Sequence, residues 1–175
     1  MTLSLFHKLL GESFDLLPNS LRALHDGRSR AFSGRCDVAR GTGVLSRFFG
    51  FITSLPPEGD NQPIQVTIAC GHDQELWIRE FGRAKMKSIL TARHNILLER
   101  LGPMRFRFKL DYDHSRHTIK WNLVHVAALG IPLPVRWFSA VTAEEYEQNG
   151  KYCFNVSAVL PLAGMLVQYK GWLND

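Results

Sequence analysis

The sequence predicts a mainly β domain: an antiparallel curved sheet or barrel-like meander of about nine strands, preceded by short N-terminal helices. From residue 63 onward, apolar residues such as Ile64, Val66 and Ile68 alternate with polar ones such as Gln65 and Thr67. Turn signals separate these runs at intervals of about 8–12 residues. Long helical segments between successive strands are absent from the pattern, so a parallel sheet is not expected.

The N-terminal segment, residues 1–28, is expected to be helical. Phe6 and Leu9 belong to a short apolar stripe, and Pro18 interrupts the pattern that follows it. Because proline disrupts a helix interior but suits a helix start, we expect a break at Pro18 and a new helix over residues 19–25. Residues 31–173 then form the β body of a single domain that spans 1–175.

Residues 31–40 are the first expected strand, and residues 44–52 follow as a short amphipathic segment. A loop over residues 55–61 precedes the period-two pattern. Later connections include the kinked stretch 130–134, the Asn149-Gly150 hairpin turn and a last turn over 161–164. Residues 135–146 are expected to form one strand, and residues 165–173 the closing strand.

A sheet of this size leaves two interpretations of its interior open. It must close, split into two layers or wrap around a helix, because long exposed edges invite aggregation. A closed antiparallel barrel can hold one small ligand. Eleven Phe and four Trp also supply enough volume to fill the same space. The sequence favours neither a cavity nor a solid core.

The composition excludes a disordered, collagen-like or coiled-coil protein and argues against a nucleic-acid-binding one. The chain has 175 residues and a net charge of +5, from 21 Lys+Arg and 16 Asp+Glu. Its densest basic stretch, residues 79–107, interleaves Lys and Arg with apolar residues, as the solvated face of a sheet does. We therefore expect no nucleic-acid partner, since basic charge alone gives only weak non-specific attraction.

The sequence also predicts a compartment. The N-terminus lacks the basic region and unbroken apolar run of a secretory signal, and no stretch approaches the roughly 20 apolar residues of a membrane span. The cysteines, Cys36, Cys70 and Cys153, show no CxxC spacing. Sparse, separated thiols are typical of reduced cytoplasmic proteins, so we expect a cytoplasmic protein without a transmembrane segment.

A set of ordered motifs resembles a known family. The motifs are Leu17-Pro18, Leu24-His25, Gly34, Arg40-Gly41-Thr42-Gly43, Trp77-Ile78-Arg79-Glu80-Phe81-Gly82, Glu99-Arg100-Leu101-Gly102-Pro103, Ile131-Pro132-Leu133-Pro134, Leu160-Pro161, Gly164 and Tyr169-Lys170-Gly171-Trp172-Leu173. Their order is similar to that of the bacterial family catalogued as domain of unknown function 4166. Members of that family are sometimes fused to saccharopine-dehydrogenase-like NAD-binding domains. The resemblance thus implies an oxidoreductase partner and a link to small-molecule metabolism, and it carries over no catalytic residue or cofactor.

Arg79 and Glu99 are the principal candidate site residues. Arg79 shares one strand face with Trp77 and Phe81, and Glu99 alternates with apolar neighbours two strands later. If that face is interior, Arg79 can hold a ligand carboxylate or phosphate with its planar fork. Glu99 can then serve as a second polar anchor or as an acid/base. The alternative is a purely structural Arg79–Glu99 pair inside the barrel.

Six further residues complete the candidate set. Possible walls of a cavity are Trp77, Phe81, Trp121, Tyr169 and Trp172, although such aromatic residues are more often core residues with a satisfied polar group. His25 ends the second helix, where a cation would complement the helix dipole, and the helix could also place it over a barrel mouth. No local ligand spacing indicates a metal site, and no serine or cysteine nucleophile is paired with a histidine.

Three hypotheses follow for function. The first is a binding domain, without catalytic activity, for a small apolar or amphipathic ligand held in a β cavity. The second is an enzyme acting on a small molecule with Glu99 or His25 as acid/base, and the third is an interaction module docked on an oxidoreductase. No cofactor is expected. The sequence does not identify the ligand, the inward strand face or the oligomeric state.

Overall fold

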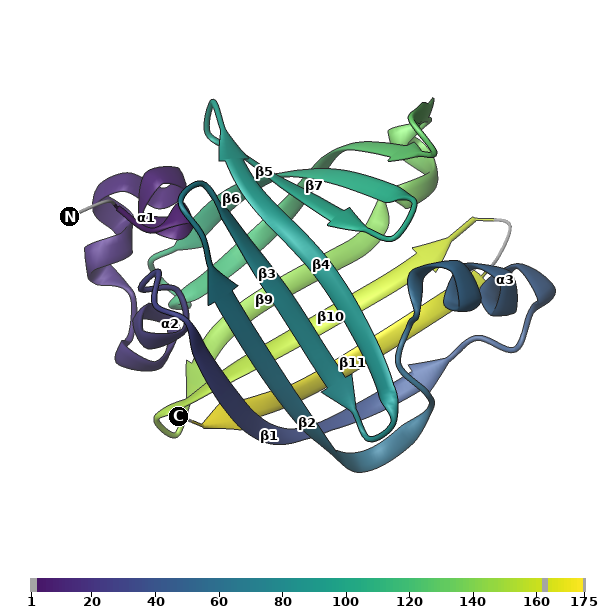
Figure 1. Cartoon of the computed structure of the whole chain (residues 1–175), viewed down its shortest axis with the longest axis horizontal. Helices are drawn as coiled ribbons and strands as arrows, with labels where there is room; N and C mark the ends of the chain where they lie inside the picture. Colours follow the sequence, from purple (N-terminus) through teal and green to yellow (C-terminus); the bar gives the residue numbers. More distant parts are fainter. Residues whose placement is uncertain (1–2, 162–163, 175) are drawn as a thin grey trace.

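The computed structural model describes residues 3–161 and 164–174 and confirms the mainly β architecture (Figure 1). In these residues eleven strands form one antiparallel sheet. The strands are β1 (Arg30–Arg40), β2 (Gly59–Cys70), β3 (Gln74–Phe81), β4 (Ala84–Arg93), β5 (Ile96–Leu101), β6 (Met104–Asp113), β7 (Thr118–Ala128), β8 (Ile131–Leu133), β9 (Ala140–Gln148), β10 (Lys151–Leu160) and β11 (Gly164–Asn174).

All strands except β8 join in a closed barrel. Neighbours along the chain pair from β1 to β7, and β11 returns to pair with β1. The edge of β7 that faces away from β6 has two partners. Its first residues pair with β9, and its last residues pair with β8, which lies outside the barrel. Closure leaves no long free edge, which is the outcome expected for a sheet of this size.

Short helices cover the end of the barrel where β1 begins. They are α1 (Leu5–Leu10), the 3-10 helix η1 (Gly11–Leu16) and α2 (Asn19–Leu24). Pro18 immediately precedes α2, which confirms the predicted break. The side chains of Phe6 and Leu21 are fully buried, so these helices plug the barrel and share its core.

Helix α3 (Val44–Thr53) connects β1 to β2 at the opposite end of the barrel, at the right of Figure 1. The 3-10 helix η2 (Val135–Phe138) lies between β8 and β9. In the part of the chain that the structure describes, no helix is long and apolar enough to cross a membrane.

Residues 129–146 depart from the prediction. The expected kinked connection contains β8, because Leu129 and Gly130 both take positive φ angles, 52° and 84°, and turn the chain tightly back onto β7. The single strand expected over 135–146 is wrong: η2 comes first, with Phe138 buried, and β9 begins at Ala140. The expected loop 55–61 is shorter, since β2 starts at Gly59, and residues 162–163 of the expected last turn lie outside the described residues.

Two glycines allow β1 and β11 to approach closely. A Cβ on Gly34 would lie 1.8 Å from the backbone oxygen of Trp172, and one on Gly171 would lie 2.3 Å from the backbone oxygen of Arg35. Real Cβ atoms do not tolerate such distances, so these positions require glycine where the first and last strands close the barrel.

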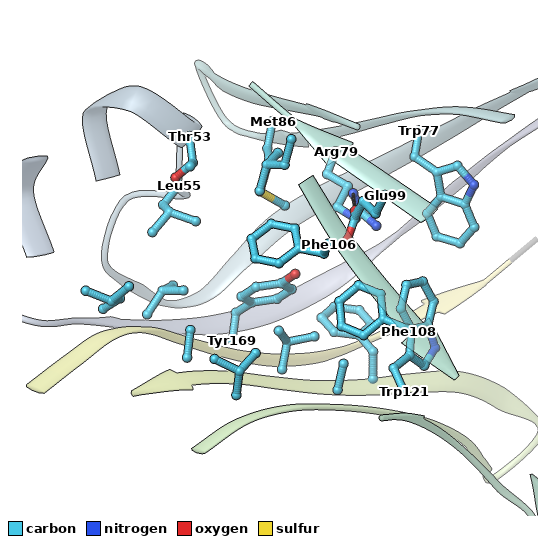
Figure 2. A pocket seen from close by; sticks show the side chains of 18 of the residues that line it. Thr53, Leu55, Trp77, Arg79, Met86, Glu99, Phe106, Phe108, Trp121 and Tyr169 are labelled. Carbon is cyan, nitrogen blue, oxygen red and sulfur yellow. Dashed lines mark ion pairs between the residues drawn. The ribbon is translucent and has the colours of Figure 1, made fainter. Parts of the chain in front are cut away.

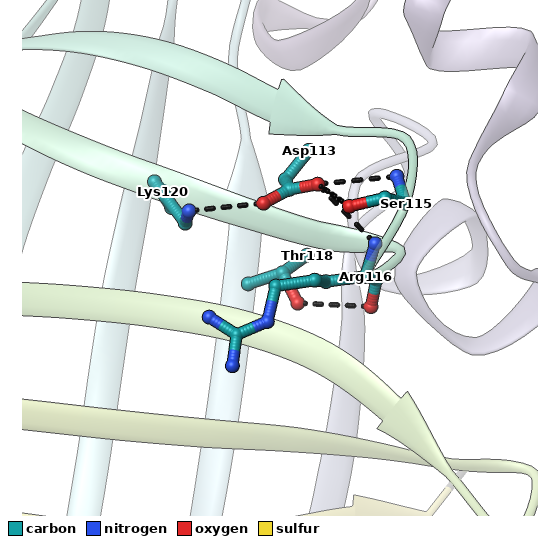
Figure 3. A network of polar contacts seen from close by, with 5 residues as sticks. All are labelled: Asp113, Ser115, Arg116, Thr118 and Lys120. Atoms are coloured by element: carbon teal, nitrogen blue, oxygen red, sulfur yellow. Dashed lines mark hydrogen bonds and ion pairs between the residues drawn. The ribbon is translucent and has the colours of Figure 1, made fainter.

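The β6–β7 connection is organised by Asp113 (Figure 3). Asp113 Oδ1 accepts hydrogen bonds from the backbone N–H groups of Ser115 and Arg116 and from Ser115 Oγ at 2.7 Å. Asp113 Oδ2 accepts from Lys120 Nζ at 3.0 Å, and Thr118 Oγ1 donates to the Arg116 carbonyl. The bonds from Ser115 and Lys120 hold the pKa of the Asp113 carboxyl well below its ordinary value.

The substitution Asp113→Asn is expected to destabilise the fold at neutral pH and to matter less in acid. The folded-state pKa lies below the unfolded one, so the stabilisation is present above the ordinary carboxyl pKa of about 3.9 and is lost as the pH falls. Urea unfolding of both proteins across this range checks the expectation. Asparagine keeps one acceptor oxygen but places an uncharged amide nitrogen where Oδ2 accepts from Lys120. A stability difference that stays constant with pH would contradict the expectation, because the contribution of the charge is lost when Asp113 is protonated.

Three free cysteines lie in the barrel strands, and burial suppresses their ionisation. Burial raises the pKa of Cys36 and of Cys70 to about 11 and also raises that of Cys153. At pH 8, a thiol of pKa 11 is ionised in only about one molecule in a thousand.

Alkylation by iodoacetamide at pH 8 should therefore be slow in the native protein. For Cys36 and Cys70 we expect protection on the order of 100-fold relative to the urea-unfolded chain, because an unperturbed thiol has a pKa of about 8.5. A time course of labelling by mass spectrometry measures this ratio. Native labelling at the unfolded rate would contradict the burial of these thiols.

Candidate ligand cavity

The barrel interior contains a partly open cavity of about 170 Å³ between its core and the α3 end (Figure 2). The walls come from strands all around the barrel and from the segment after α3, and most of them are apolar. They include Leu55, Ile64, Val66, Met86, Leu101, Met104, Phe106, Phe108, Phe138, Val156, Leu160, Leu166 and Val167. The alternation of the strands explains this composition, because every second residue points inward.

Arg79 and Glu99 provide a polar group on the cavity wall. Both side chains are largely buried, with exposed fractions of 12% and 13%, and Arg79 Nη1 lies 3.8 Å from Glu99 Oε1. That distance is an ion pair without a close hydrogen bond. Arg79 Nη1 also donates to Ser88 Oγ at 2.9 Å, and the guanidinium lies over the ring of Trp77 at 4.9 Å.

Tyr169 faces the Arg79–Glu99 pair from β11. Figure 2 shows its hydroxyl directed toward them across the cavity. Burial raises the pKa of Tyr169 to about 12, and the Arg79 cation opposes part of that shift. Tyr169 is therefore a neutral hydrogen-bond donor at physiological pH.

Trp121 leaves a donor unsatisfied in the same wall. Its side chain is buried, and among the described residues its indole Nε1–H has no hydrogen-bond partner. Unpaired buried donors cost free energy and are rare in native proteins. A ligand atom that accepts a hydrogen bond would remove this cost.

A second polar cluster lies between the cavity and the N-terminal helices. His25 Nε2 lies 2.7 Å from Glu145 Oε2 of β9, with both side chains buried, and the His25 ring stacks on Phe6 at 3.5 Å. Burial, followed by the charge of Glu145 and a hydrogen bond to it, raises the pKa of Tyr152 well above its ordinary value. These contacts join α2 to the barrel.

Glu75 belongs to the same region. It accepts a hydrogen bond from Trp77 Nε1 at 2.9 Å, and burial raises the pKa of its carboxyl despite that bond and the nearby His25. Two acidic side chains, Glu75 and Glu145, are thus enclosed where the helices meet the strands.

The structure brings together five of the eight predicted site residues. Arg79, Glu99, Trp77, Trp121 and Tyr169 line the cavity, and the strand face shared by Trp77, Arg79 and Phe81 points inward. Phe81 is buried beside Tyr169, at 6.1 Å between ring centroids, but is not part of the wall.

Two predicted residues lie elsewhere. Trp172 is half-buried outside the cavity, and Lys151 Nζ lies 3.7 Å from its ring centroid. Its separation of three from Tyr169 places the two side chains on opposite faces of β11, since strand side chains alternate. His25 is covered by the helices rather than exposed at a barrel mouth. His25 does not line the cavity, whereas its partner Glu145 does.

Sequence reasoning missed Glu145 and Tyr152, which join the cavity to the plug. Glu145 follows Val141 and Ala143 at a spacing of two, so it occupies an inward position of β9. Met86, Phe106 and Phe108 carry the same alternation and also line the cavity.

Nearly the whole chain is similar to a known family of proteins. No curated protein matches the chain. The model of a family described as a domain of unknown function (DUF4166) matches residues 17–173, nearly the whole chain. The glycines that close the barrel and the Arg79 and Glu99 motifs all lie within this range, and the chain belongs to the DUF4166 family.

Proposed function

We propose that the protein binds a small apolar or amphipathic ligand in the barrel cavity and has no catalytic activity of its own. The observation that carries this proposal is the apolar space inside the barrel with Arg79 and Glu99 on its wall. A volume of about 170 Å³ compares with the apolar cavity of about 150 Å³ that holds benzene in another protein. The ligand would be the size of an aromatic ring or a short aliphatic chain. We place this activity in the cytoplasm, in keeping with three cysteines that form no disulfide.

The polar groups favour a ligand that accepts hydrogen bonds. Arg79 carries five N–H donors, and among the described residues its one hydrogen bond goes to Ser88. Tyr169 and Trp121 add two more donors around the same space. A carboxylate on a short apolar chain would satisfy these donors and outcompete the loosely placed Glu99 for Arg79.

The enzyme alternative rests on Glu99 or His25 as acid/base. The binding proposal is preferred because His25 is held behind Glu145, away from the cavity space. Glu99→Gln separates the two hypotheses. It should abolish turnover in an enzyme, whereas in a binding protein it should strengthen carboxylate binding by removing the competing anion.

Native mass spectrometry of protein purified without added ligand tests the proposal first. A stoichiometric small molecule that leaves on denaturation supports it and identifies the ligand class. A protein that carries nothing is then titrated with octanoate, octanol and octylamine, and the fluorescence of Trp77 and Trp121 is followed. Saturable binding with octanoate preferred supports the proposal. If none of the three ligands binds, the binding proposal is overturned, and docking on an oxidoreductase is the function to test.

A further inference from the structure

Helix α3 exposes large apolar side chains to solvent and buries small and polar residues against the barrel. Ser46, Gly50 and Thr53 are buried, and Ser46 Oγ donates to the Leu166 carbonyl at 3.1 Å. In contrast, Val44 and Phe51 are exposed by 83% and 87%. Among the described side chains of α3, this is the reverse of the usual arrangement of a surface helix. The exposed residues follow one helical stripe, so this face is built to contact something apolar.

A second apolar projection lies at the same end of the barrel. The β7–β8 turn exposes Leu129 by 82%, and Ile131 and Trp137 follow it on the surface. Leu129 has a φ of 52°, a conformation in which asparagine or glycine is ordinary and a bulky apolar residue is rare. The position thus tolerates backbone strain to keep a leucine in solvent, which points to a functional contact.

The two projections border the same end of the cavity. Thr53 at the end of α3 and Phe138 at the end of η2 both line it, and Leu55 packs against the cluster that contains Phe138. Figure 1 shows α3 and the green segment after β7 at the end opposite the N-terminal helices.

Arginines flank these apolar projections. Arg100 and Arg105 lie directly opposite each other on exposed positions of β5 and β6, and the Leu129 N–H bonds to the carbonyl of the adjacent Pro103 at 3.0 Å. Like charges in that arrangement repel and are stabilised by an anion. Exposed Arg47 on α3 and Arg136 on η2 add positive charge beside the apolar side chains, against the exposed carboxylates of Glu58 and Asp60 at this end.

We propose that this end of the barrel docks on the surface of a lipid bilayer that contains anionic phospholipids. Apolar side chains, a tryptophan and surrounding arginines are the combination that inserts shallowly at a headgroup boundary and neutralises lipid phosphates. This docking proposal does not depend on whether the cavity holds a ligand. If it does, docking would place the cavity end against the membrane.

Co-sedimentation of the full chain with vesicles tests the proposal. We expect binding to vesicles of equal parts phosphatidylglycerol and phosphatidylcholine, little binding to phosphatidylcholine alone, and weakening by salt. Phe51→Ser and Leu129→Asn should each reduce binding by about tenfold or more. Leu129→Asn is also expected to fold at least as stably, because asparagine suits the positive φ.

Matched controls lie at the other end of the barrel. Leu16→Ser removes a side chain exposed by 60% from η1 and should leave vesicle binding unchanged. Arg105→Glu should weaken binding and Arg93→Glu should not. Equal binding to both vesicle types, or equal loss from Leu16→Ser and Phe51→Ser, overturns the proposal. So does a dimer in solution that Phe51→Ser abolishes while vesicles fail to bind, since the occupant would then be a second copy.

Discussion

Replacing His25 by alanine is expected to lower the free energy of unfolding by about 3–5 kcal/mol. His25 makes a 2.7 Å hydrogen bond to Glu145, with both side chains buried, and its ring stacks on Phe6. The substitution leaves the buried Glu145 carboxylate without this partner, and it opens a void beside Phe6. Because His25 ends α2 and Glu145 belongs to β9, the lost contact also loosens the plug.

Urea unfolding measures this loss, and His72→Ala is the matched control. His72 Nδ1 also lies 2.7 Å from a carboxylate, that of Asp73, but both side chains are exposed. Exposed pairs contribute little, so this control should leave stability unchanged. Equal effects of the two substitutions would show that burial does not set the importance of the His25 contact.

The fold was largely accessible from the sequence because strand periodicity is a local property. Alternation around Ile64 and Trp77 predicted the strands and the residues that share each face, whereas the inward face became clear only from the closed barrel. The secondary structure around η2 could not be predicted from periodicity. Its apolar residues Val135, Trp137 and Phe138 fit a strand as well as a short helix, and only the packing of Phe138 at the barrel end decides between them.

The residues of the candidate site likewise include some that a local pattern predicts and some that it does not. Arg79 and Glu99 are predictable because each interrupts an apolar face, and the sequential pairing of β3, β4 and β5 brings them to 3.8 Å. The His25–Glu145 contact joins residues 120 positions apart, and no local pattern specifies such a pair. The exclusion of Trp172 from the wall, by contrast, follows from parity along β11 once Tyr169 is inward.

Substituting Arg79 by methionine is expected to reduce octanoate affinity by about 10- to 100-fold, as loss of a charged hydrogen bond costs roughly 1.5–3 kcal/mol. Octanol affinity should change little, because the apolar walls stay intact. Isothermal titration of both ligands measures the two effects separately. Glu99→Gln is expected to change octanoate affinity in the opposite direction, since it frees Arg79 from its one nearby carboxylate among the described residues.

Arg79→Met is also expected to lower the stability of the fold, because it leaves Glu99 largely buried without its cation. The double substitution Arg79→Met with Glu99→Met removes both charges, and replacing a buried pair by apolar residues of similar volume is often neutral or stabilising. If Arg79 anchors the ligand, the double variant folds, binds octanol and has lost its preference for octanoate. If octanoate affinity survives in the double variant, or survives Arg79→Met while stability falls by several kcal/mol, the pair serves the barrel alone. Stability and head-group preference therefore report on two different roles of the same pair.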